Sequence, residues 1–224
     1  LGVLLGMLML IVVGVVAGIM IYKRMQTGKW QAPQKQDFTA IVDTVTEPLR
    51  NDPPPVTRTI FLERNAVALT PGRDDAPAGI SSVLASGKNQ PVTTVGYRGT
   101  DKNWNKLVNC VRSLFAPFDV NVTDKRPTDT DNFAMVVVGG KAKDLGINTA
   151  HVGGLAPFAP DPIAKPVVFA FTGSLGTSNT RTICETIGME VAHAYGLDHG
   201  YLCKDVMTYL TGCGSKSFVD KDVP

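Results

Sequence analysis

The chain has 224 residues, of which 44% are hydrophobic and 19% charged, and its formal net charge is +2 at pH 7. This composition is typical of a globular protein and leaves room for one ordinary domain with an appendage. The charge is close to neutral, and no basic stripe interleaved with aromatic side chains occurs, so we expect no nucleic-acid partner.

The first 22 residues, LGVLLGMLMLIVVGVVAGIMIY, carry no charge. A helix of that length spans roughly 30 Å, the thickness of a bilayer core. A cleavable signal peptide usually has a shorter apolar region that ends at small residues. We therefore expect residues 1–22 to form a transmembrane signal anchor, with secretion after signal cleavage as the alternative.

The orientation of this segment is open. By the positive-inside rule, the following Lys23, Arg24 and Lys29 favour a cytoplasmic C-terminal domain. Because the chain begins at Leu1 rather than at Met, we also expect residues beyond one or both of its ends.

Cysteine usage favours the opposite orientation. Four cysteines lie behind the apolar segment: Cys110, Cys184, Cys203 and Cys213. An even number suits two disulfides in an oxidising compartment, whereas four buried free thiols would suit the cytosol. No C-x-x-C pair occurs, so a zinc ribbon is excluded. We favour export, with a periplasmic or extracellular domain.

Residues 23–57 read as a polar linker that closes on NDPPPV, a stiff spacer, and residues 58–224 as the folded domain. The expected elements in that domain are a strand in RTIFLERN, a loop in TPGRDDAPAG, a helix over about 102–116, a strand in FDVNVTD, buried strands in FAMVVVGG and PVVFAFTG, and a late helix from about Thr180. This order predicts an α/β (α+β) fold with a mixed twisted sheet, one early helix and one helix that closes the core.

The late helix contains MEVAHAYGLDH, residues 189–199. Residues three or four apart share a helix face, so Met189, Glu190 and His193 point into one space. Gly196 can adopt the left-handed turn that ends a helix, and this turn lets His199 return to His193.

This stretch resembles the metzincin zinc-peptidase pattern H-E-x-x-H-x-x-G-x-x-H, followed by a Met-turn in DVMTYLTGCG. From Ile60 onward the order of elements is similar to a zincin catalytic domain. IFLERN, TPGRDD and APFDVNVTD are similar to segments of secreted metallopeptidase-like proteins of predatory soil bacteria. The resemblance implies a zinc ion, Glu190 as general base, His193 and His199 as zinc ligands, Met207 as the Met-turn residue and Tyr209 as an extra ligand. We expect the disulfides Cys110–Cys184 and Cys203–Cys213, the second of which would clamp the Met-turn loop.

Met189 departs from the pattern, which has histidine there. A thioether is soft and neutral and a poor ligand for zinc, and two histidines alone would hold the ion weakly. The candidates for a third ligand are His151, Asp198, Cys203, Tyr209 and Glu190 itself. For His151 and Tyr209 the commoner roles are an exposed loop residue and a core aromatic, and Cys203 is expected in a disulfide.

Asp74 and Asp75 in TPGRDDAPAG could bind calcium, although a turn with solvated carboxylates is the commoner arrangement. The expected function is hydrolysis of peptide bonds in a peptide or protein substrate by a membrane-tethered or exported zinc endopeptidase. The alternative is a pseudo-peptidase whose cleft binds peptide without cleaving it.

Overall fold

The computed structural model describes residues 57–85, 89–128, 131–149 and 152–221. The proposed membrane segment, the linker up to residue 56 and His151 lie outside these residues. Among the helices in the described part of the chain, none has the length and apolar character needed to cross a bilayer.

The central feature is a five-stranded mixed sheet with the order β5-β1-β6-β8-β7. Its strands are β1 (Thr59–Glu63), β5 (Asn121–Thr123), β6 (Ala134–Val138), β7 (Gly154–Leu155) and β8 (Val167–Ala170). The first four strands of that order are parallel, whereas β7 runs antiparallel to β8 at the edge. The sequence prediction is confirmed for β1, β5, β6 and β8, but it did not include β7.

Both faces of this sheet are covered, which explains why the central strands are continuously apolar rather than alternating. Successive side chains of a strand point to opposite faces. Ile60, Val136 and Val168 join one hydrophobic cluster, and their neighbours Phe61 and Val137 join the other. The sheet is therefore the middle layer of the domain.

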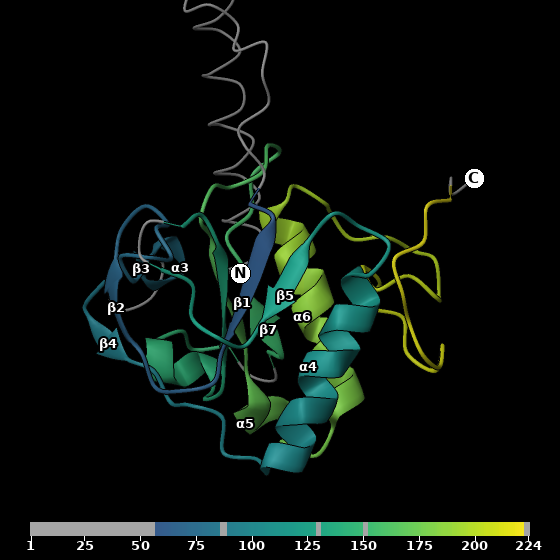
Figure 1. The fold of residues 1–224 in the computed structure, drawn as a ribbon, viewed down its shortest axis with the longest axis horizontal. Coiled ribbons are helices and arrows are strands. Elements are labelled where there is room, and N and C mark those ends of the chain that lie inside the picture. Colours follow the sequence, from purple (N-terminus) through teal and green to yellow (C-terminus); the bar gives the residue numbers. More distant parts are fainter. Residues whose placement is uncertain (1–56, 86–88, 129–130, 150–151, 222–224) are drawn as a thin grey trace, which may run out of the picture. The chain divides into compact units, whose positions relative to one another are not determined.

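Helices α4 (Asp101–Phe115) and α6 (Thr180–Ala194) pack side by side over the first face (Figure 1). The Thr100 side chain caps α4 by accepting a hydrogen bond from the Asn103 N–H. The buried stripe of α4 follows helical spacing: Trp104, Leu107, Val108, Val111, Leu114 and Phe115. Both helices lie within one or two residues of their predicted bounds.

The second face is covered by a smaller layer that the sequence did not predict. It contains a three-stranded sheet of β2 (Ala68–Pro71), β3 (Ile80–Ser81) and β4 (Val92–Thr93), the short helix α3 (Ser82–Ala85) and the 3₁₀ helix η1 (Ala142–Leu145). Another short helix, α5 (Thr172–Leu175), follows β8 directly.

The predicted loop over residues 70–79 begins inside β2, and its carboxylates are not fully solvated. Asp74 is half-buried and accepts hydrogen bonds from the Ser82 hydroxyl and the Val167 N–H. Burial raises the pKa of Asp74 despite these bonds. Asp75 forms an ion pair with Lys165 at 3.8 Å. The pair of aspartates thus ties the smaller layer to the strand β8, which is a structural role.

The two expected disulfides, Cys110–Cys184 and Cys203–Cys213, are both present. The first joins the middle of α4 to the first turns of α6, and the second closes a loop after α6. Disulfides of this kind persist in oxidising compartments, so they indicate an extracytoplasmic domain.

Candidate metal and catalytic site

Helix α6 ends in a tight turn that only glycine fits. Tyr195 caps the helix, and Gly196 follows with φ of +92°, in the region that favours glycine. A Cβ atom at Gly196 would lie 2.7 Å from the Pro160 carbonyl oxygen, so the chain passes too close for any side chain. The predicted helix end is therefore confirmed, and it turns the chain back toward α6.

This turn brings the two predicted histidine ligands together. The rings of His193 and His199 have centroids 4.4 Å apart and meet edge to face. The Nδ1 atom of His193 lies 2.7 Å from the Leu197 carbonyl oxygen, and that of His199 lies 3.2 Å from the Met207 carbonyl oxygen. Since a carbonyl can only accept, each Nδ1 donates in the neutral ring, and each Nε2 is left with a lone pair. Histidines that bind metals are usually oriented by a bond of this kind.

The segment of the predicted Met-turn contacts His199 through the Met207 carbonyl oxygen. Asp205 holds the turn, because its side chain accepts from the Met207 N–H at 3.1 Å and its carbonyl accepts from the Thr208 N–H at 3.3 Å. The Met207 side chain is only 2% exposed and belongs to the hydrophobic cluster under α4 and α6. A buried methionine thus anchors the loop whose carbonyl orients His199.

Glu190 is buried in α6, with 8% of its surface exposed. Its carboxyl group makes no hydrogen bond or ion pair with any side chain or backbone group that the structure describes. Burial raises its pKa to about 8. Gly154 of the edge strand β7 makes room for it, since a Cβ atom there would lie 2.6 Å from the Glu190 Cγ and Oε1 atoms. Glu190 is therefore a carboxyl group that holds its proton at neutral pH when no cation is near.

Glu190 lines a cleft of about 550 Å³ between α6, β7 and the Met-turn loop. Met189 and Tyr209 line the same cleft. Burial raises the pKa of Tyr209, and the proximity of the acidic side chains Glu190 and Asp198 raises it further, so the phenol remains a hydrogen-bond donor. Burial also lowers the pKa of His193, which favours the neutral imidazole, the form that metals bind.

The candidates for a third ligand have different positions. Met189 is half-buried and packs against the hydrophobic cluster under α6. Cys203 is in a disulfide, and Asp198 accepts from the His199 N–H at 2.7 Å. Tyr209 lies against the His199 ring, with centroids 4.0 Å apart, although it is 72% exposed. Among the residues the structure describes, no group of three or more His, Cys, Asp or Glu side chains gathers as a metal site.

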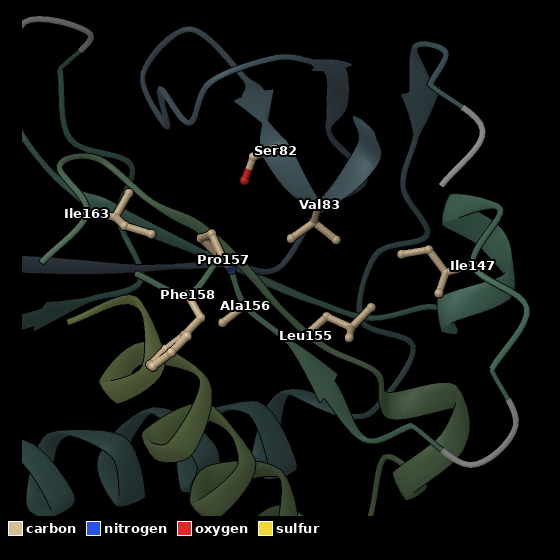
Figure 2. Close-up of a pocket in the computed structure, with 8 residues that line it drawn as sticks. All are labelled: Ser82, Val83, Ile147, Leu155, Ala156, Pro157, Phe158 and Ile163. Atoms are coloured by element: carbon tan, nitrogen blue, oxygen red, sulfur yellow. The ribbon is translucent and has the colours of Figure 1, made fainter. Parts of the chain in front are cut away.

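The structure also contains an apolar pocket of about 460 Å³, which the sequence did not predict (Figure 2). The end of β7 and the segment after it contribute four of its residues, from Leu155 to Phe158, and α3 contributes Val83 across from them. The Phe158 ring meets the His193 ring edge to face at 5.9 Å. The extended segment from Gly154 to Phe158 thus runs between Glu190 and this pocket. Its one sequence signal is the clustering of glycine and proline in GGLAPF.

No protein-family model matches this sequence, and no curated protein matches it significantly. The resemblance to metzincins therefore stays a prediction that rests on residues 189–209.

Proposed function

We propose that the domain is an exported endopeptidase of zincin, metzincin-like type that cleaves peptide bonds with Glu190 as general base. The observation that carries this proposal is the pair of oriented imidazoles, His193 and His199, beside a buried carboxyl group with no partner among the described residues. Perturbed carboxyl groups in clefts are typical of catalytic sites.

The site offers two of the three protein ligands that a catalytic zinc ion usually has. Zinc accepts neutral imidazole nitrogens, and a catalytic site normally has three protein ligands and an open position. His193 and His199 would hold the ion through Nε2, and the nearby Tyr209 phenol is the oxygen donor best placed to join them. When bound, zinc supplies polarisation of the substrate carbonyl.

The remaining chemistry belongs to the chain itself. A carboxylate at Glu190 would take the proton of the attacking water and pass it to the leaving amine. Because the pKa is about 8 in the protein alone, the base form increases as the pH rises, and a cation nearby would lower that pKa.

The substrate would bind as an extended peptide. Among the described residues, β7 pairs with β8 alone, so its outer edge could take an added strand. A peptide along this edge would pass Glu190 at Gly154 and reach the apolar pocket at Leu155 and Phe158. Tyr209 lines the same cleft, so its phenol would donate to the substrate carbonyl whenever it does not bind the metal.

A second candidate function is peptide binding without hydrolysis. One observation favours it: Met189, at the position of the first histidine in the metzincin pattern, packs against the core in place of a ligand. In this case the cleft and the free edge of β7 would serve an interaction module.

The test is cleavage of an unstructured protein substrate by the purified chain with added zinc. We expect slow cleavage by the wild type and none by Glu190→Gln, which keeps the shape of the side chain and removes the base. Tyr201→Phe is a matched control, because Tyr201 is 81% exposed and makes no contact with the cleft. Binding of the substrate without cleavage, equal in the wild type and in Glu190→Gln, would establish the second candidate.

We also propose that residues 1–22 anchor the domain in a membrane, with the domain on the periplasmic or extracellular side. An uncharged segment of this length would hold the chain through carbonate washing. Recovery of a soluble form that lacks the segment would show a cleaved signal peptide instead.

A further inference from the structure

The carboxyl ends of the parallel strands lie at the edge of the sheet where α6 begins, whereas the candidate metal site lies near the end of α6. Within the five-stranded sheet, the next strand after β1 is β5, on one side of β1, whereas the strands after β6 are β7 and β8, on the opposite side. The connections therefore leave β1 and β6 in opposite directions. In open α/β sheets, ligands bind in the crevice at such a point, outside the carboxyl ends of the strands.

A cavity of about 380 Å³ lies at this edge of the sheet. Three segments line it: Gly140–Asp144 after β6, Thr172–Thr177 after β8, and Val95–Arg98, which crosses in front of them. The crossing is close, since a Cβ atom at Gly139 would lie 2.0 Å from the Val95 carbonyl oxygen. The segment Val95–Arg98 is thus packed closely against the end of β6, and both help to line the cavity.

The charged residues of this cavity are mainly cationic. Arg98, Lys141 and Lys143 line it, together with one carboxylate, Asp144. The Asp144 carboxylate accepts a hydrogen bond from the Lys141 N–H at 2.8 Å, so it holds the turn after β6. In the described part of the chain, the three cations make no ion pair.

The Lys141 side chain reaches from the end of β6 to the end of the neighbouring strand β8. A Cβ atom at Gly173, the residue after Thr172, would lie 2.7 Å from the Lys141 Cγ atom and 3.0 Å from its Cε atom. The aliphatic part of the Lys141 side chain therefore packs against Gly173, which follows β8, whereas Lys141 itself follows β6. The buried Thr172 lines the same cavity and adds a hydroxyl group.

We propose that this cavity binds a small ligand through an anionic group, a phosphate or a carboxylate. Three cationic side chains and one carboxylate line the cavity, and that carboxylate already accepts a hydrogen bond from the Lys141 N–H. The site is separate from the candidate metal site, because Thr177 lies just before the start of α6 and His193 lies near its end. A helix of 15 residues spans about 22 Å. The proposal therefore does not depend on peptidase activity.

The test is binding of inorganic phosphate and of acetate to the full chain, measured by calorimetry and thermal unfolding at constant ionic strength. We expect at least one of these anions to bind and to raise the Tm by about 5 °C near saturation. The variant Arg98→Gln/Lys141→Gln should weaken that binding at least tenfold, and Lys143→Glu should do the same. All three side chains are exposed, so folding should be retained, which circular dichroism checks.

The matched control is Arg73→Gln/Lys204→Gln, which removes the same charge outside the cavity. It should bind as the wild type does. Binding of phosphate alone, or of acetate alone, would support the proposal and identify the group recognised. Equal Tm shifts in the wild type and in all variants would show a general salt effect and overturn the proposal, as would the absence of binding of both anions.

Discussion

Glu190 and its neighbours show which parts of the site the sequence predicts. The spacing from Glu190 to His193 and His199 follows from helix geometry and one glycine turn, so these residues were predictable. The contact of Glu190 with Gly154 joins residues that are 36 positions apart, and no local pattern indicates it. The contact of Phe158 with His193 was unpredictable for the same reason.

The raised pKa of Glu190 predicts a specific pH dependence of stability. Because the pKa is about 8 in the folded protein against 4.5 in the reference state, the folded protein binds this proton more tightly. Stability from this group is therefore fully present below about pH 4.5 and is lost as the pH rises toward 8. Each unit of pKa corresponds to about 1.4 kcal/mol, so the loss amounts to several kcal/mol.

The substitution Glu190→Gln should remove this loss of stability at rising pH, because the glutamine side chain has no titratable proton to lose. We expect its Tm, measured in the presence of a chelator, to exceed that of the wild type by an amount that increases from pH 5 to pH 8. The other titrating groups are the same in both proteins and cancel in the comparison. Parallel Tm curves would show that Glu190 is solvated in solution.

At the scale of elements, prediction succeeded where a segment carries its own pattern. α4 and α6 have helical apolar periodicity and, in α4, a Thr100 cap. The two-residue strand β7 has no pattern of its own and exists because β8 provides its partner. The three-stranded sheet was missed because β2 continues into TPGRDD, whose turn residues mask the pairing with β3.

The turn at the end of α6 should tolerate no Cβ atom. Gly196→Ala combines a left-handed φ with a backbone oxygen at 2.7 Å, so we expect a loss well above the roughly 1–2 kcal/mol of the φ strain alone. Gly212→Ala is the matched control, because Gly212 has φ of +76° and nothing within 4 Å of its Cβ position. The two free energies of unfolding, measured by urea titration, should differ clearly. Equal losses would contradict the close packing of Gly196 on Pro160.

For the whole molecule, the mixed α/β sheet was predictable because both of its faces are buried. This burial makes FAMVVV and VVFAF continuously apolar, and such runs between glycines and prolines are typical of central strands. Strand order was not predictable from these runs alone. The placement of β5 beside β1, with β6 on the other side, depends on how α4 crosses the sheet.

The two disulfides should contribute unequally to the stability of the whole domain. Their sequence separations are 74 and 10 residues, and the chain-entropy account gives about 4 and about 3 kcal/mol. We expect Cys110→Ser/Cys184→Ser to lower the free energy of unfolding more than Cys203→Ser/Cys213→Ser, measured by urea titration. A reversed order would show that the Met-turn loop, rather than the link between α4 and α6, limits stability.

The most direct test of the candidate site is the zinc affinity of the wild type compared with Met189→His, by competition with a chelator. A third imidazole one helical turn before His193 would complete the usual set of three ligands without a change of backbone. We predict that Met189→His binds one zinc per chain roughly tenfold more tightly or better, and that Met189→Leu, the control for shape, does not. If the wild type holds one zinc as tightly as Met189→His, another side chain is the third ligand, and the account of an incomplete site at the end of α6 is contradicted.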